Sequence, residues 1–295
     1  MQITMNSVDR RMFDACIGST EPYSCVIQAI QHHIAAGGGR VRAQFSLDAS
    51  LRLGIPSEDG ITVAAICELL HNASLIHDDL LDRAPLRRGV PTVWAAFDDA
   101  IAVCAGDLLL SSAFALLGEL TSVEFLAKAL SLVHRRTRDV ILGQGLEQVC
   151  SPDSLESYEL VAIGKSASLL SLPFELPLLL SGNEQSLATV QFASQAFAVA
   201  YQMLDDLADY DEDIRKGSVN AVAVALAAGS PDFRSSCALV SSRAQELIHI
   251  SIKYATELPM ECGSTMIAYA EGMRSKLLTG PTSTSRQFEL SRHGS

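Results

Sequence analysis

Two short aspartate runs are the residues of this chain whose types and spacing best fit catalytic chemistry. The motif D-D-x-x-D occurs twice, and its aspartates are Asp78, Asp79 and Asp82 and then Asp205, Asp206 and Asp209. Residues four apart on a helix lie on one face, so each motif presents neighbouring carboxylates that repel each other. Mg²⁺ suits such oxygen ligands, because it is shared between a few carboxylates and substrate phosphates. The pair of motifs predicts magnesium ions around one diphosphate, whereas a single motif would equally fit a solvated acidic helix end.

Two arginines, Arg87 and Arg88 in LRRGVPT, follow the first motif. Arginine binds phosphate oxygens through a planar fork of donors and keeps its charge at all relevant pH values. Taken alone, two adjacent arginines are more often surface residues. Directly after a metal-binding motif, they predict contacts with the phosphates that the metal would share.

The elements that must position these residues are helices. Apolar residues recur with helical periodicity, as in residues 61–81 and 191–210, and alternating strand patterns are rare. Turn-forming residues divide the chain into long segments without any composition typical of linkers. We therefore predict an all-α fold in which residues 1–295 form a single large helical bundle, with a polar tail from about residue 280.

The composition of the chain indicates which classes of partner to exclude and in which cellular compartment to expect the protein. The formal net charge of −12 argues against a nucleic-acid partner. Seven cysteines lie in apolar surroundings without a C-x-x-C pair, which predicts reduced thiols and a cytoplasmic protein. No signal peptide is evident. The most apolar runs, 101–117 and 166–182, contain Asp107 and Glu175 respectively, so we expect buried core helices and no integral membrane anchor.

The motifs together resemble the trans-type isoprenyl diphosphate synthases, also called polyprenyl synthetases. The resemblance is strongest in LLHNASLIHDDLLDRAPLRRGVPTVW and AGDLLLSSAF, and it continues through GQGLEQ, GKSASLL and YQMLDDLADYDED. It implies a helical bundle of the isoprenoid synthase type with a central apolar cavity, and a homodimer. It also implies condensation of isopentenyl diphosphate with an allylic diphosphate, with three Mg²⁺ ions per active site.

The resemblance assigns roles to individual residues. All six motif aspartates would bind metal and serve catalysis together with Lys165. The allylic diphosphate would contact Arg87, Lys165, Gln202 and Lys216, and isopentenyl diphosphate would contact Arg42, His71 and Arg88. On its own, His71 would more often be a buried core histidine.

Two segments depart from the family pattern. The basic signature G-G-K-R-x-R-P appears here as GGGRVRA, with Gly39 in place of the lysine and Ala43 in place of the proline. After the second motif, DIRKGSVNAVAVALAAG replaces the usual lysine-bearing loop. These changes keep three alternatives open: a prenyltransferase with a non-isoprenoid acceptor, a terpene cyclase, and a non-catalytic regulatory subunit of a synthase.

The resemblance also gives an expectation for product length. The residue five positions before the first motif helps to form the floor of the family's product tunnel, and a large aromatic residue there stops growth early. Here that residue is Ala73, followed by Ser74, and both are small. We therefore expect a product of 20 carbons or more.

Overall fold

The computed structural model describes residues 2–17, 24–147 and 151–279 of the chain. Three features of the sequence analysis lie outside these ranges: the polar tail expected from about residue 280, the cysteine Cys150, and Gln148, the last residue of the GQGLEQ segment. The described residues fall into two compact units, which follow each other at Val133 and His134. Each unit has its own set of packed helices, and the expectation of a single domain stays a prediction.

Helices make up almost all of the first unit. Its elements are α1 (Gln2–Ile17), α2 (Cys25–Ala35), α3 (Val41–Arg52), α4 (Ser57–Leu81), β1 (Leu86–Arg87), β2 (Val90–Pro91), α5 (Val93–Ala96), α6 (Asp99–Leu117), the 3₁₀ turn η1 (Val123–Phe125) and the beginning of α7 (Leu126–Glu147).

The second unit contains the remainder of α7 and the elements that follow it. These are α8 (Leu155–Ala162), the π-helical turn η2 (Ile163–Ala167), α9 (Ser168–Leu180), η3 (Glu184–Ser186), α10 (Leu187–Lys216), α11 (Ala221–Ala227), α12 (Phe233–Thr256), η4 (Pro259–Glu261) and α13 (Ser264–Thr279). Within the described ranges, β1 and β2 are the only strands. The all-α prediction is confirmed.

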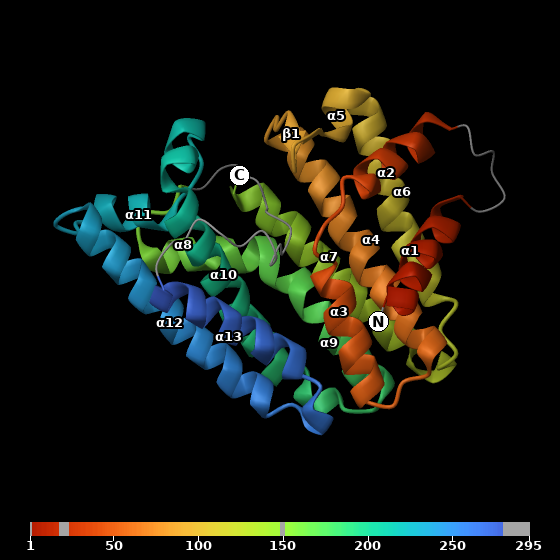
Figure 1. The fold of residues 1–295 in the computed structure, drawn as a ribbon. Helices are drawn as coiled ribbons and strands as arrows, with labels where there is room; N and C mark the ends of the chain where they lie inside the picture. Colours follow the sequence, from red (N-terminus) through yellow and green to blue (C-terminus); the bar gives the residue numbers. More distant parts are fainter. Residues whose placement is uncertain (1, 18–23, 148–150, 280–295) are drawn as a thin grey trace. The chain divides into compact units, whose positions relative to one another are not determined.

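Helix α4 lies at the centre of the first unit and packs against α1, α3 and α6 (Figure 1). Its middle is mostly apolar, and nearly all residues between Thr62 and Ile76 are buried, including the polar Glu68, His71 and Asn72. Asp59 in its first turn accepts hydrogen bonds from the backbone N–H and the hydroxyl of Thr121, which joins the start of α4 to the segment after α6. The C-terminal end of α4 carries the first aspartate motif.

A two-residue hairpin turn follows α4 and returns the chain towards it. Strands β1 and β2 pair antiparallel, with Arg87 opposite Val90. Arg88 and Gly89, between them, have φ values of 54° and 77°, the left-handed conformation of a type I′ turn. Next to this turn, Arg87 pairs with Asp79, and the guanidinium group of Arg88 lies against Gly38.

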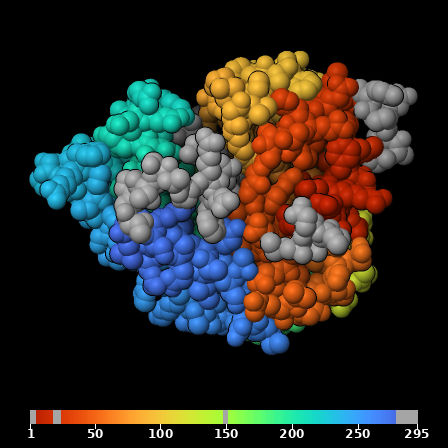
Figure 2. Space-filling view, viewed as in Figure 1, coloured from red at the N-terminus to blue at the C-terminus, as the bar shows by residue number. Residues whose placement is uncertain are grey.

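In the second unit, α10 packs against α9 and α12, and α12 packs against α13. Figure 2 shows α12 and α13 as one continuous blue surface. Small residues such as Ala193, Ala196 and Ala200 are buried along α10 and allow neighbouring helices to approach closely. Helix α10 ends at Gly217, whose φ of 72° supplies the left-handed C-terminal cap.

Two glycines allow α7 to contact the π-helical turn η2 directly. A Cβ atom on Gly143 would lie 2.4 Å from the carbonyl carbon of Gly164. No side chain fits there, so the two backbones meet without intervening atoms. Gly164 immediately precedes Lys165, and π-helical turns are frequent at functional sites.

Among the residues that the structure describes, three segments are long and apolar enough to cross a membrane: α4, α6 and the run from α8 to α9, Leu155–Leu180. In α4 and in Leu155–Leu180, 83% and 72% of the most apolar stretch is buried. In α6 only 44% is buried, so the expectation of a buried core helix over 101–117 is confirmed for one face and wrong for the other. A mostly apolar helix predicts burial, but α1, α2, α4 and α5 pack against α6 and still leave one stripe of it exposed.

Candidate functional site

The first aspartate motif occupies the last turn of α4. Asp78 and Asp79 are buried, and Asp82 is the half-exposed C-terminal cap. Arg87 donates from Nε to Oδ2 of Asp79 at 2.8 Å and from Nη2 to Oδ1 at 2.9 Å, a bidentate ion pair. Burial raises the pKa of Asp79, while hydrogen bonds from Arg87 act in the opposite direction. The middle aspartate is therefore held by the protein itself.

The second motif lies near the C-terminal end of α10 and shows the same feature. The carboxylate of Asp206 accepts hydrogen bonds from Tyr158 Oη at 2.8 Å, Gln202 Nε2 at 2.8 Å and the Ala221 backbone N–H at 2.6 Å. Burial raises the pKa of Asp206 to about 6, despite the lowering effect of these donors. The pKa of Tyr158 is raised well above its ordinary value by burial and by Asp206, so its hydroxyl keeps the proton that it donates.

The first and last aspartates of each motif lie one helical turn apart. Asp78 and Asp82 share a face of α4, and Asp205 and Asp209 share a face of α10. Asp209 departs from helical geometry, with φ −108° and ψ 15°. The predicted metal role of all six aspartates stays a prediction, but the structure adds protein partners for Asp79 and Asp206 that the sequence did not indicate.

The donor chemistry of these carboxylates fits Mg²⁺. Each motif offers a pair of oxygen ligands one turn apart, and Mg²⁺ usually completes its coordination with water and substrate phosphates. Within residues 2–17, 24–147 and 151–279, no three His, Cys, Asp or Glu side chains gather closely enough to hold an ion without further ligands. Phosphate oxygens would therefore have to supply part of any metal coordination.

The other residues predicted to contact the allylic diphosphate occupy distinct settings. Lys165 is half-buried in η2, and Gln202 donates to Asp206 one turn further along α10. Lys216, at the exposed end of α10, forms an ion pair with Glu212 at 2.7 Å. Arg87 is engaged by Asp79. The substrate role of these four residues stays a prediction.

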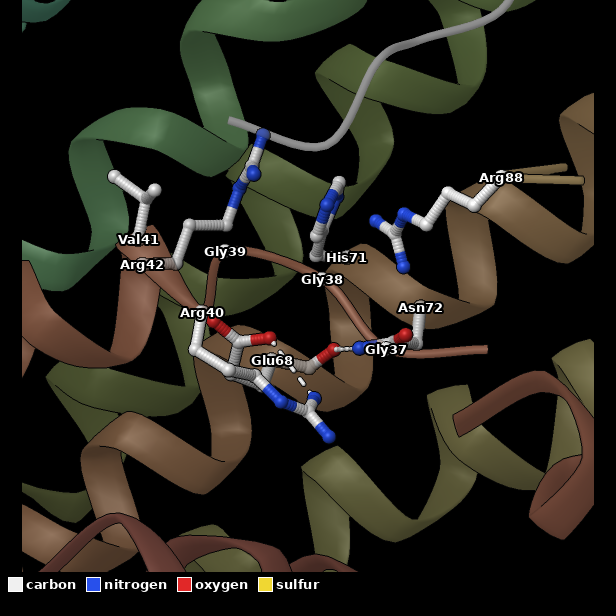
Figure 3. Close-up of a pocket in the computed structure, with 10 residues that line it drawn as sticks. All are labelled: Gly37, Gly38, Gly39, Arg40, Val41, Arg42, Glu68, His71, Asn72 and Arg88. Atoms are coloured by element: carbon white, nitrogen blue, oxygen red, sulfur yellow. Dashed lines mark hydrogen bonds and ion pairs between the residues drawn. The ribbon is translucent and has the colours of Figure 1, made fainter. Parts of the chain in front are cut away.

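The structure brings Arg42, His71 and Arg88 together at one pocket of the first unit (Figure 3). Gly37, Gly38 and Gly39 form its rim, and the view draws the three basic side chains on one side of this glycine loop. Arg42 and His71 are almost fully buried. Gathered guanidinium and imidazole groups make the pocket suitable for an anion with several oxygens, such as a phosphate or diphosphate.

Gly38 makes room for Arg88. A Cβ atom on Gly38 would lie 2.7–2.9 Å from three atoms of the Arg88 guanidinium group. Its φ of +151° is also one that other residues rarely adopt. The glycine loop therefore both follows a path that requires glycine and places Arg88 in the pocket.

Polar residues that the sequence analysis missed support the pocket from the other side of the loop. Glu68 accepts from Arg40 Nη1 at 3.3 Å and from the Ala43 backbone N–H at 3.0 Å, and Arg40 also pairs with Asp9 at 2.9 Å. Arg40 occupies the position after Gly39, yet its charge is directed to these carboxylates. A glutamate within the apolar run of α4 was the available signal, because buried charges require partners.

His33 and Asn72 form a second support for the pocket. His33 Nε2 lies 3.1 Å from Asn72 Oδ1, and the Asn72 amide donates to the carbonyl of Glu68 at 2.7 Å. Burial and the nearby Arg87 and Arg88 lower the pKa of His33 to about 3. His33 is therefore neutral and donates a hydrogen bond without adding charge.

The residues expected to control product length lie on α4 between the pocket and the first motif. Ala73 is buried, and the hydroxyl of the half-buried Ser74 donates to the carbonyl of His71 at 2.8 Å. Ser74 is thus turned back onto its own helix. Neither side chain is bulky, as the sequence indicates, and their effect on product length stays a prediction.

Comparison with known proteins gives consistent matches. The model of the polyprenyl synthetase family matches residues 24–222. Octaprenyl diphosphate synthase of Escherichia coli is 31% identical over 193 residues, which cover 64% of this chain and 58% of that protein. The all-trans-nonaprenyl-diphosphate synthase (geranyl-diphosphate specific) of Rhodobacter capsulatus is 33% identical over 200 residues, with 66% and 60% covered. The chain spans about three-fifths of the length of these curated relatives.

Solved structures share the fold. A decaprenyl diphosphate synthase from Rhodobacter capsulatus superimposes with a TM-score of 0.82 at 20% identity, covering 94% of this chain and 97% of that one. A polyprenyl synthase from Caulobacter crescentus, complexed with calcium and isoprenyl diphosphate, gives 0.80 at 24% identity, covering 93% and 95%.

The contact between Gly38 and Arg88 gives a testable prediction for the pocket. In Gly38→Ala, the new methyl group would displace the Arg88 guanidinium, and loss of one charged hydrogen-bond donor should weaken binding of inorganic diphosphate about tenfold. Gly37→Ala is the matched control, because Gly37 also has a positive φ but has no atom within 4 Å of its Cβ position. Isothermal titration calorimetry would measure both affinities. Equal weakening in the two variants would contradict the proposed placement of Arg88.

Proposed function

Because the chain belongs to the polyprenyl synthetase family, we propose that it is a Mg²⁺-dependent prenyltransferase that condenses isopentenyl diphosphate with an allylic diphosphate. The observation that supports this most directly is the arrangement along α4. His71 of the anion pocket and Asp78 of the first motif are seven residues apart, two turns on nearly the same face. A diphosphate in the pocket would therefore be held about 10 Å along the helix from a metal-binding motif.

The residues of the chain divide the work. Asp78 and Asp82 would offer oxygen ligands for Mg²⁺ at the end of α4, and Asp205 and Asp209 would do so in α10. Asp79 and Asp206, the other two predicted ligands, already accept hydrogen bonds from protein donors. Bound Mg²⁺ would supply positive charge that favours departure of the allylic diphosphate. Lys165 adds a cation for that diphosphate. Arg42, His71 and Arg88 bind the diphosphate of isopentenyl diphosphate and so fix the position of its double bond.

The reaction itself requires no protein nucleophile. The allylic C–O bond breaks, and its electron pair leaves with the diphosphate. The double bond of isopentenyl diphosphate then forms the new C–C bond, and a proton is lost to the released diphosphate. Apolar surroundings must keep water from the allylic cation.

The glycine at position 39 favours a second candidate function. Gly39 lines the pocket without contributing a charge, and Arg40 is paired with Asp9 and Glu68. The pocket therefore has one cation fewer than the family signature implies. A prenyltransferase that uses a different, less charged acceptor would need fewer donors in this position.

The proposed function is tested by incubating the chain with Mg²⁺, isopentenyl diphosphate and C5, C10 or C15 allylic diphosphates, and sizing the products by mass spectrometry. We expect an elongated product, and we expect Asp78→Ala and Asp205→Ala to lower diphosphate release at least a hundredfold, because each removes a ligand oxygen. Near-normal turnover in either variant would contradict the assignment of the aspartates as Mg²⁺ ligands. Diphosphate release without chain elongation would favour the second candidate acceptor.

We also propose a product of 20 carbons or more, supported by the small side chains of Ala73 and Ser74. Ala73→Phe should shorten the product by one or more five-carbon units, because the aromatic ring would occupy space beside α4. Mass spectrometry of the products checks this, with Ala73→Leu as the intermediate step and the melting temperature as a control for folding. An unchanged product length in a folded Ala73→Phe variant would assign the chain-length control to other residues.

We propose further that the protein is a homodimer that buries the exposed face of α6. This face is a stripe of Val103, Cys104, Asp107, Ser111 and Ala115, on a helix that is otherwise strongly apolar. Light scattering should give about twice the mass of one 31.6 kDa chain. Val103→Glu should lower the mass towards one chain, while Val123→Glu, an exposed position outside the stripe, should leave it unchanged. A single-chain mass for the unmodified protein would overturn this assembly.

A further inference from the structure

Asn220 is the residue through which the start of α11 holds the end of α10. It is 1% exposed and lies in the segment where the sequence departs from the family's lysine-bearing loop. Its Nδ2 donates to the backbone carbonyl of Asp206 at 2.8 Å and to Oδ2 of Asp213 at 2.9 Å. Its Oδ1 accepts from the backbone N–H of Val222 at 2.9 Å and so caps α11. One side chain thus uses its donor group on α10 and its acceptor on α11.

The two contacts on α10 bracket the irregular part of that helix. Asp206 and Asp213 lie seven residues apart, and Asp209, with its non-helical φ and ψ, lies between them. A helix bends sharply where a side chain or another group intervenes in its backbone ladder. Asn220 is the described side chain that donates to both ends of this stretch, so it fixes the course of the backbone that carries Asp209.

The carboxylate of Asp206 is anchored by the same connection. Ala221, next to Asn220, donates its backbone N–H to Asp206 Oδ2, and Tyr158 of α8 donates to the same oxygen. Asp206 and Tyr158 are both nearly inaccessible to solvent. Asp205 is therefore followed by a fixed residue, while Asp209 lies on a stretch fixed from both sides.

We propose that Asn220 is a positioning residue for the second aspartate motif. It sets the spacing between the carboxylates of Asp205 and Asp209, and thereby the affinity of this motif for a divalent cation shared with a diphosphate. This proposal rests on the proposed function, in which these two aspartates hold the metal. In this chain the hydrogen bonds of Asn220 fix the backbone after the second motif, in the segment where the usual lysine-bearing loop is replaced.

The substitution Asn220→Ser separates positioning from helix capping. Serine retains an oxygen that can cap α11, but it has no amide to reach Asp206 and Asp213. Mn²⁺ binding, measured by electron paramagnetic resonance with inorganic diphosphate present, should weaken about tenfold, as for other groups that orient metal ligands. Because Asp206 and Asp213 lose a buried donor, the melting temperature without metal should fall, so the Mn²⁺ affinities are compared at a temperature at which both proteins are fully folded. Asn183→Ser is the matched control, because its amide donates only to Ser181 in the described contacts, and Mn²⁺ affinity should stay unchanged.

The outcomes distinguish this proposal from the proposed function. If the unmodified chain binds Mn²⁺ with diphosphate and Asn220→Ser binds it equally well, the positioning role is overturned and the metal assignment stands. If the unmodified chain binds no Mn²⁺, or Asp205→Ala binds it normally, the metal role of the motif and this proposal fall together. If Asn220→Ser does not fold, Asn220→Thr carries the same test, because threonine also keeps a capping oxygen for α11 and has no amide to donate to Asp206 and Asp213, without adding charge.

Discussion

Burial of the middle carboxylate of each aspartate motif is the constraint on which the arrangement of the site depends. A charged carboxylate that leaves water loses several kcal/mol of solvation unless the protein supplies donors. Asp79 receives a guanidinium fork, and Asp206 receives a phenol, an amide and a backbone N–H. Meeting this requirement places the β1–β2 hairpin against α4, and it places α8 and α11 against α10.

The same requirement gives the middle aspartate of each motif a structural role. A pair of carboxylates one turn apart would suffice to offer oxygen ligands, but a helix end held only by such a pair would have no reason to keep its orientation. The hydrogen bonds of the middle aspartate connect the helix to neighbouring elements. They therefore also fix the positions of the first and last aspartates of the motif. In the first unit, α4 extends this order to the pocket lined by Arg42, His71 and Arg88, because Glu68, His71 and Asn72 belong to the same helix.

Much of this arrangement could be predicted from the sequence. Apolar periodicity indicated α4 and α10, which span the expected residues 61–81 and 191–210, and the family resemblance pointed to Arg42, His71 and Arg88, which line one pocket. These predictions were possible because apolar periodicity indicates the buried face of a single helix, and because the family resemblance indicates which residue types to expect at given positions.

Other features depend on which elements meet in space, which a single helix pattern does not contain. The ion pair of Arg87 with Asp79 joins a hairpin to a helix, and the contacts of Asn220 join two helices across a short turn. The partial exposure of α6 was missed for the same reason, since its composition is mostly apolar and only Asp107 and Ser111 mark the exposed face. The π-helical turn around Lys165 could not be predicted either, because five residues are too few to show a periodic pattern of apolar residues.

The meeting of Gly143 with Gly164 has a mechanical consequence. Contacts between side chains can adjust through rotation about their bonds, so helices that touch through them can slide slightly without breaking the interface. Here backbone touches backbone, with no rotatable atoms between them. Any displacement of α7 around Gly143 is therefore transmitted directly to Gly164 in η2. Lys165 follows Gly164, so it moves together with α7.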